Sequence, residues 1–112
     1  MSGKYEIFSD KSEKFHFRLK AGNGEIILAS QAYSSKSAAH NGIESVQKNS
    51  ADDERYERLT AKDGSPYFNL KAANQQIIGH SEMYKSTASR DNGIDSVKKN
   101  GSTDKIVDLT AE

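Results

Sequence analysis

Apolar and polar residues alternate along residues 15–20, and this alternation is the clearest pattern in the chain. Phe15, Phe17 and Leu19 occupy one set of positions, and polar residues occupy the positions between them. Successive side chains of a β-strand point to opposite faces of its sheet, so the segment is predicted to be a strand with one buried face. Residues 67–71 repeat the pattern, with Phe68 and Leu70 on the apolar side.

Two more strands are predicted around each of these. Residues 5–8 are rich in β-forming side chains and lead into a polar turn at residues 10–14, whose counterpart at residues 62–65 contains the Asp-Gly pair that hairpins favour. Third strands are predicted over about residues 25–33 and 76–84. In the turn before the second of these we expect Asn74 to take the left-handed backbone conformation, because that turn contains no glycine. The facing of the third strand stays open, since Ile26-Ile27 interrupts the alternation.

A short amphipathic helix is predicted after each set of three strands. Ser35 and Ser86 can cap the first free N–H groups, and the helices are expected to stop at Asn49 and at Asn100-Gly101. Each helix contains an internal glycine, which costs roughly 1 kcal/mol against alanine and indicates a close approach of the helix backbone to the sheet. The apolar stripe of the first helix recurs at i, i+3, i+4 and i+7 and consists of Ala39, Gly42, Ile43 and Val46.

The chain is an internal repeat with a period of 51 residues. When residues 5–53 are laid on residues 56–104 without a gap, 21 of 49 positions are identical. We therefore predict an α+β protein built as a tandem repeat of two β-β-β-α units with antiparallel sheets. Repeat one is expected over residues 4–54 and repeat two over 55–105, within a single domain of residues 1–112.

Residues 105–110 after the second helix echo residues 58–60 after the first, which predicts an additional C-terminal strand over 105–110. We expect the two copies to exchange these post-helix strands, so that the closing strand joins the sheet that the first copy begins. One copy alone can bury little apolar surface, which gives the copies a physical reason to pair. The chain is accordingly expected to be a monomer whose two repeats form an internal pseudo-dimer.

Composition narrows the functional classes. Sixteen basic and sixteen acidic side chains give a net charge of zero, which removes the bulk electrostatic argument for binding nucleic acid or an anionic membrane. Cysteine is absent, which excludes disulfides, thiol catalysis and cysteine-ligated zinc. The chain contains no apolar run suited to export or to spanning a bilayer, so a cytoplasmic protein without a membrane partner is expected.

The repeated motifs resemble those of the YegP-like family, also called UPF0339 or DUF1508. The resemblance covers nearly the whole chain and implies the duplicated form of the family, with sheets shared between copies. It implies nothing about activity, because the family is named for being uncharacterised. It is carried by Phe17-x-Leu19-Lys20-Ala21-x-Asn23-Gly24-x-Ile26-Ile27, by Ser30-x-x-Tyr33-x-Ser35 and by Asn41-Gly42-Ile43-x-Ser45-Val46-x-Lys48-Asn49, all of which except Gly24 recur in the second copy.

Few residues point to chemistry. His16, His40 and His80 have no repeat-equivalent histidine and no spacing suited to a metal or a catalytic triad, so they are interpreted as surface residues. The acidic run of residues 52–54 is interpreted as a charged linker between the copies. We therefore expect no cofactor, no metal and no enzymatic activity.

Polar residues kept in both copies form a second group of candidates. The tyrosines can pack at the corner between strand and helix, and the asparagines and serines near the helix stripe can hydrogen-bond the neighbouring copy. An enzyme would need Ser30, Tyr33 and Lys20, or their mates, to meet in a pocket between the copies. The retained positions are Ser30, Tyr33, Asn41, Ser45, Lys48, Ser81, Tyr84, Asn92, Ser96 and Lys99.

A non-catalytic binding or protein-interaction module is the function that the sequence favours, because no nucleophile, base and oxyanion donor assemble in it. The sequence does not identify the partner, and a protein is the candidate it leaves open. The alternative is single-stranded nucleic-acid binding through the sheet face opposite the helices, where Arg18, Lys20, Tyr67 and Lys71 would supply charge for phosphates and a ring for stacking. A small enzyme with its site between the repeats is the third reading.

Overall fold

The computed structural model describes residues 3–110 and has the predicted α+β architecture. Each copy contributes three strands and one helix, and a further strand closes the chain. In chain order the elements are β1 (Lys4–Ser9), β2 (Phe15–Lys20), β3 (Ile26–Ala29), α1 (Lys36–Asn49), a 3-10 turn η1 (Asp53–Arg55), β4 (Tyr56–Thr60), β5 (Pro66–Lys71), β6 (Ile77–His80), α2 (Thr87–Asn100) and β7 (Ile106–Asp108).

All seven strands form one continuous sheet in the order β4-β5-β6-β3-β2-β1-β7. The structure adds two features to the predicted antiparallel sheets that the copies share. First, the third strands of the two copies pair with each other through Ala29 and His80, which fuses the two halves. Second, β7 runs parallel to β1, so the sheet is mixed.

The post-helix strands are exchanged between the copies, as predicted. The strand after α1 is β4, which pairs with β5 in the second copy, and the strand after α2 is β7, which pairs with β1 in the first copy. Asp108 of β7 forms a 2.9 Å ion pair with Lys36 at the start of α1, and the Leu109 amide donates to the Ile7 carbonyl at 2.8 Å. The closing strand is therefore held both to the sheet and to a helix.

Both helices begin and end where the sequence predicts. The side chains of Ser35 and Ser86 accept hydrogen bonds from the amides of Ala38 and Ser89, which satisfies donors that helix starts leave free. The predicted stripe of α1 is buried. A Cβ atom on Gly42 would lie 2.5 Å from the Tyr33 hydroxyl oxygen, so the glycine makes room for a tyrosine on the sheet below.

One hydrophobic core lies between the helices and the sheet, and it contains side chains of both copies. The two helices pack on β2 and β5, whose inward residues Phe17, Leu19, Phe68 and Leu70 are fully buried. This burial confirms the alternation read from the sequence. Within residues 3–110, no helix lies on the other face of the sheet.

The third strands are shorter than predicted and irregular. A register shift in the pairing of β2 with β3, between Leu19 and Lys20, brings both Ile27 and Leu28 into the core. This shift is the reason that Ile26-Ile27 broke the alternation. The left-handed residue of the turn before β6 is Gln75 (φ 73°), so the expectation for Asn74 was wrong; Asn74 accepts a hydrogen bond from the Gln76 amide instead.

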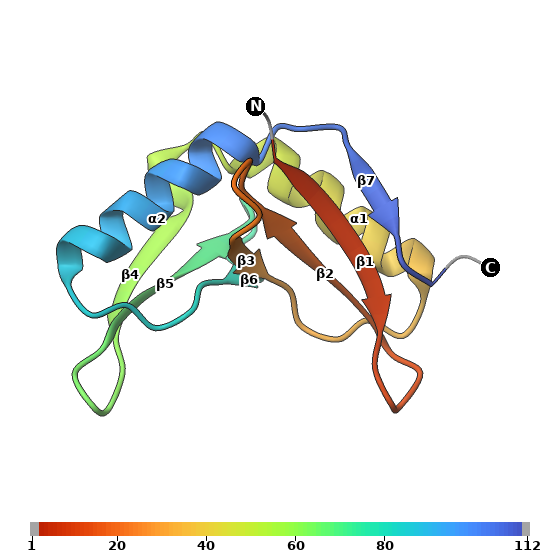
Figure 1. Ribbon diagram of the computed structural model, residues 1–112, viewed down its shortest axis with the longest axis horizontal. Helices are drawn as coiled ribbons and strands as arrows, with labels where there is room; N and C mark the ends of the chain where they lie inside the picture. Colours follow the sequence, from red (N-terminus) through yellow and green to blue (C-terminus); the bar gives the residue numbers. More distant parts are fainter. Residues whose placement is uncertain (1–2, 111–112) are drawn as a thin grey trace.

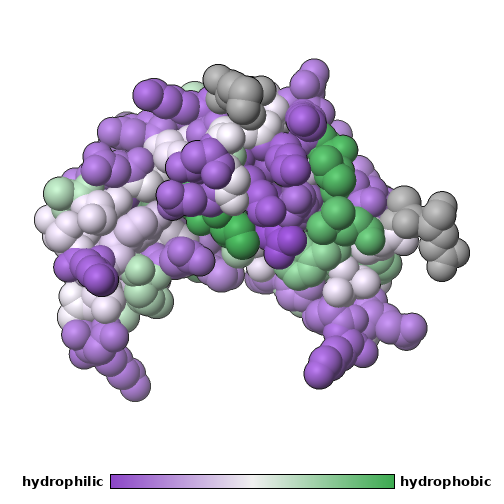
Figure 2. Space-filling model, viewed as in Figure 1, coloured by the Kyte–Doolittle hydropathy of each residue, from purple (hydrophilic) through white to green (hydrophobic). Residues whose placement is uncertain are grey.

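The molecule is an arch in which β3 and β6 lie at the centre and the β1–β2 and β4–β5 hairpin ends project downward on either side (Figure 1). In the space-filling view the lower side is hollowed between these two projections (Figure 2). Leu28 of β3 packs directly over Gly79 of β6, its repeat equivalent, where a Cβ atom would lie 2.7 Å from the leucine. The two copies therefore contribute unequal side chains at the centre of the sheet. The first copy contributes a leucine, and the second contributes a glycine, which has no side chain.

Candidate functional site

The helix-free face of the sheet carries the predicted interaction residues. In the first copy, cross-strand pairing places Glu6 opposite Arg18 and Phe8 opposite His16 on this face. Residues directly opposite in an antiparallel pair share a face and lie within side-chain contact. The hairpin β1–β2 therefore presents a row of charged and aromatic side chains away from the core.

Glu6 is the centre of this row. It accepts a hydrogen bond from Arg18 Nε at 2.8 Å and lies 3.3 Å from Lys20 Nζ and 3.6 Å from Lys4 Nζ. Burial alone would raise the pKa of Glu6, but the bonds from Arg18 and Lys20 outweigh it and hold the pKa below its usual value. The carboxylate is thus ionised at neutral pH and compensates the cations around it.

Phe8 lies between two partners on the same face. The His16 ring stacks on it with centroids 5.3 Å apart, and the Arg18 guanidinium carbon lies 4.7 Å from the Phe8 ring centroid. His16 Nε2 is 2.7 Å from Asp10 Oδ2, and this bond is the main reason that the pKa of Asp10 is lowered. The Phe8 ring is therefore already stacked within the protein.

The second copy presents a less charged version of the same row. Lys71 Nζ lies 3.1 Å from Glu57 Oε2, and Glu57 Oε1 accepts a hydrogen bond from Asn69 Nδ2 at 3.4 Å. Tyr67 lies opposite Leu59. The structure thus places Arg18, Lys20, Tyr67 and Lys71 on one face, as predicted, but in two pairs with β3 and β6 between them. Both lysines are paired with a glutamate.

A hollow of about 300 Å³ lies on this face where the two copies join. Its walls are mainly apolar, and the charged groups Arg18 and Glu82 line it together with them. Such a volume is at the small end of the range for ligand pockets. The lining residues are Phe8, Arg18, Ile26, Leu28, Ala29, His80, Ser81 and Glu82.

Most of this hollow was missed by sequence reasoning, which named only Arg18 and Ser81 as site residues and His80 as a surface residue. The hollow depends on the pairing of β3 with β6, a contact that no local pattern specifies. One signal was present: Leu28 and Gly79 are unlike residues at matched positions of a repeat whose neighbouring isoleucines are identical. His80 is exposed in agreement with its prediction, although it lines the hollow.

Several retained polar residues have a structural role. Ser30 Oγ accepts from the Phe17 amide at 2.9 Å and donates to the Gln31 carbonyl at 2.8 Å, and Ser81 repeats both bonds in the second copy. The hydrogen bonds expected from the helix serines to the neighbouring copy were wrong: Ser45, like Ser96, accepts from the asparagine four residues on in its own helix. Asn41, Asn92, Lys48 and Lys99 lie exposed on the helices.

The three side chains that a small enzyme would need lie in different parts of the structure. Lys20 lies on the helix-free face beside Glu6, whereas Tyr33 lies on the helix side, stacked on Phe17 with centroids 6.1 Å apart. The hydroxyl of Ser30 is buried and bonded to backbone groups. These three side chains therefore do not meet in one pocket.

The acidic run is more than the linker that was predicted. Asp53 Oδ1 lies 3.1 Å from Arg58 on β4 and 2.7 Å from Lys98 on α2, so it ties the second helix to the edge strand. Among residues 3–110, no group of three or more His, Asp or Glu side chains is placed to hold a metal ion. Within the same range, neither helix has the length and apolar character needed to cross a membrane.

The duplicated fold with a sheet shared between copies defines the class of protein. The profile of the family described as "Domain of unknown function (DUF1508)" matches the chain twice, at residues 10–57 and 61–108, and the chain belongs to this family. A UPF0339 protein of Acinetobacter baylyi is 63% identical over 98% of this chain and 99% of its own length. The UPF0339 protein YegP of Escherichia coli is 53% identical over 98% of this chain and 100% of its own length.

Two solution NMR structures of relatives have the same fold. A UPF0339 protein of Shewanella oneidensis gives a TM-score of 0.92 at 60% identity, covering 97% of this chain and 92% of that one. YegP of Escherichia coli, described as a protein of unknown function, gives a TM-score of 0.94 at 52% identity, covering 100% of this chain and 97% of that one. The resemblance drawn from the repeated motifs is thus confirmed.

Proposed function

We propose that this protein is a non-catalytic interaction module that binds a segment of a partner protein at the junction hollow, the hollow between the copies on the helix-free face. The observation that carries the proposal is the apolar lining of the hollow by Phe8, Ile26, Leu28 and Ala29 on a sheet face that no helix covers. Burying one aliphatic or aromatic side chain of a partner there contributes about 1.5–3 kcal/mol.

The charges that line the hollow indicate the kind of segment. Arg18 comes from β2 of the first copy and Glu82 follows β6 of the second copy, so a cation and an anion line the hollow from different halves of the molecule. Arg18 is already bound to Glu6, whereas Glu82 forms no ion pair within residues 3–110 and so complements an apolar side chain that has a basic neighbour. Complementary charges of this kind mainly give specificity and orientation.

A protein partner fits the face better than single-stranded nucleic acid does. Phosphates require free cations, but Arg18 and Lys20 share Glu6, and Lys71 is paired with Glu57. Several unstacked bases require several free rings, but the Phe8 ring is already stacked on His16, which leaves Tyr67 as a single ring and not a stacking platform. The division of Ser30, Tyr33 and Lys20 between separate environments likewise favours a binding role over a catalytic one.

The test is a titration of 15N-labelled protein with synthetic peptides that carry a central leucine or phenylalanine between an aspartate and a lysine, and with a ten-residue oligothymidylate. We expect the peptides to shift the amides of Ala29, His80 and Glu82, and the oligonucleotide to shift none. The variant Glu82→Lys should weaken peptide binding up to about fivefold, because an exposed ion pair contributes about 0.2–1 kcal/mol. Gln31→Lys changes the repeat-equivalent exposed position outside the hollow and is the matched control.

Shifts caused by the oligonucleotide and abolished by salt would replace this proposal with the nucleic-acid one. Absence of any shift at the junction with every peptide would overturn it, as would an equal loss of affinity in both lysine variants.

A further inference from the structure

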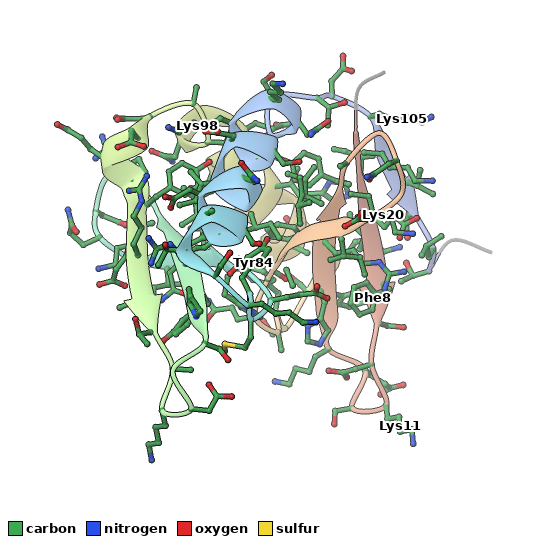
Figure 3. The ribbon with its side chains drawn as sticks, turned by 60° about the vertical axis from the view of Figure 1, so that its left-hand side comes forward. Phe8, Lys11, Lys20, Tyr84, Lys98 and Lys105 are labelled. Carbon is green, nitrogen blue, oxygen red and sulfur yellow. The ribbon has the colours of Figure 1, made fainter. Side chains whose placement is uncertain are left out.

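A second hollow lies on the helix side of the sheet, at the seam between α2 and the turn that joins β2 to β3. It has a volume of about 250 Å³ and is distinct from the junction hollow, with which it shares no residue. One wall comes from the second copy, with Tyr84, Asn92 and Ser96, and the other from the first copy, with Asn23 and Glu25. Figure 3 shows Tyr84 at the lower end of α2, next to the chain segment that leads into β3.

The seam collects polar residues that the junction hollow does not use. Tyr84, Asn92 and Ser96 all recur in the first copy as Tyr33, Asn41 and Ser45, and the glycine between them recurs as well. Gly93 is needed because a Cβ atom there would overlap the Tyr84 hydroxyl oxygen. Both copies therefore keep a tyrosine hydroxyl and the glycine that admits it against the helix.

The hydroxyl of Tyr84 does not stabilise the fold through a hydrogen bond to the described residues. The other repeat-related tyrosines, Tyr5 and Tyr56, bond the carbonyls of Gly101 and Ser50 at 2.5 and 2.6 Å. Within residues 3–110, by contrast, neither the Tyr84 hydroxyl nor the side-chain amide of Asn92 forms a hydrogen bond with the protein. A phenylalanine would fill the same core space, and the retained hydroxyl lines the hollow, where it is available to bond a ligand.

The opposite wall places a carboxylate at the seam. Asn23 Nδ2 donates a hydrogen bond to Glu25 Oε1 at 3.2 Å, and Asn23 Oδ1 accepts one from the backbone N–H of Glu25 at 3.0 Å. The turn thus holds the side chain of Glu25. Glu25 is near enough to contribute to the raised pKa of Tyr84, after burial and Glu82. The seam thus combines hydroxyls and amides, which both donate and accept, with a carboxylate, which only accepts.

We propose that this seam binds a small uncharged polyhydroxylated molecule, of the size of a monosaccharide or polyol. Several hydroxyl groups on one ligand can donate to Glu25 and exchange hydrogen bonds with Asn92, Ser96 and Tyr84, while its C–H groups cover the apolar floor. That floor is formed by Ala21 and Ile27. The lining contains no cation, which disfavours phosphates and carboxylates as ligands.

The repeat supplies a weaker counterpart. In the first copy Tyr33, Asn41 and Ser45 would face the turn that contains Asn74, with Gln76 in place of Glu25 and Ala38 in place of Ser89. The counterpart lacks the carboxylate and one hydroxyl. We therefore expect ligand to bind first at the Tyr84 seam.

The experiment is an amide-shift titration of the full chain with glucose, mannitol and myo-inositol, each to ~20 mM, about twenty times a Kd of 1 mM. We expect at least one to shift the amides of Glu25, Tyr84, Asn92 and Ser96. Tyr84→Phe keeps the ring and removes one hydrogen bond, which should weaken binding about two- to tenfold. Lys11→Ala, at the exposed tip of the β1–β2 hairpin, is the matched control and should leave the affinity unchanged.

Two outcomes would overturn the inference. In one, the seam does not bind polyols as proposed: either no polyol shifts the amide signals of the seam residues, or Tyr84→Phe binds the polyol as tightly as the parent chain does. In the other, ethanolamine binds at the seam and the polyols do not, which would make Glu25 the anchor of a cation. Because the readout residues differ from those of the junction hollow, failure here leaves the peptide experiment unaffected, and failure there leaves this one unaffected.

Discussion

At the scale of single residues, four of the five tyrosines form two repeat-related pairs with different duties. Tyr5 and Tyr56 are buried against the helix ends, and burial is the main cause that raises the pKa of both phenols. Tyr33 and Tyr84 are half-buried beside a helix glycine. The sequence predicts tyrosine packing at the strand-to-helix corner, but it does not separate a bonded hydroxyl from a free one, because both pairs are equally well retained.

Tyr5→Phe should lower the free energy of unfolding by about 1–3 kcal/mol, because it leaves the buried carbonyl of Gly101 without a donor. Tyr33→Phe should change it by less than about 0.5 kcal/mol, since Tyr33 forms no hydroxyl bond within the described residues. Urea unfolding of both variants measures the difference. Equal losses would show that ring packing alone explains these positions.

Gly42→Ala should be destabilising by about 1–2 kcal/mol. The gain in helix propensity is about 1 kcal/mol, but the new Cβ atom would lie 2.5 Å from the Tyr33 hydroxyl and 2.8 Å from the Phe17 ring. In a Tyr33→Phe background the cost should shrink, because one of the two collisions is gone. A stabilised Gly42→Ala variant in urea unfolding would contradict the close approach between helix and tyrosine.

At the scale of elements, local sequence patterns predicted those strands and helices whose defining residues lie close together in the chain. The alternation in β2 and β5 and the serine caps of the helices were enough to locate these elements, because each depends on residues a few positions apart. The third strands were placed less well, since the register shift beside Leu19 changes which residues face the core. The junction hollow could not be predicted from the sequence, because it forms where β3 pairs with β6, and no local pattern specifies that pairing.

The closing strand β7 should loosen in acid. The side-chain bond from Thr110 and the ion pair with Lys36 hold the pKa of Asp108 well below its ordinary 3.8. A carboxyl whose pKa is lowered on folding stabilises the fold above its ordinary pKa, and this stabilisation is lost as the pH falls below about 4. The amide shifts of Ile106–Asp108 should therefore change below about pH 4 before those of β5 do. In Asp108→Asn this early step should disappear; its persistence would assign the step to another group.

At the scale of the whole molecule, the copies are alike in outline and unlike at their centre. Leu28 fills the space above Gly79, and two leucines could not both occupy it. This inequality suits one chain with two copies better than two identical chains. It also gives the junction hollow a first-copy wall that contains Leu28 and Phe8.

Gly79→Leu should be destabilising by about 1–3 kcal/mol through overpacking, and Leu28→Gly by about 2–5 kcal/mol through the cavity it leaves. The double variant moves the leucine to the other copy and should recover at least about 1 kcal/mol of the summed loss. Urea unfolding of the three variants measures the coupling. Strictly additive losses would mean that the two residues do not share one space.

The central claim is that both copies are needed to build the one sheet, at whose junction the proposed binding site lies. It is tested most directly by expressing residues 1–54 and 55–112 as separate fragments. We expect each fragment alone to give the narrow amide dispersion of an unfolded chain, because pairing with itself would set Leu28 against Leu28, or Gly79 against Gly79. Mixing the two should restore a dispersed spectrum like that of the intact chain. A fragment that folds by itself would contradict the claim.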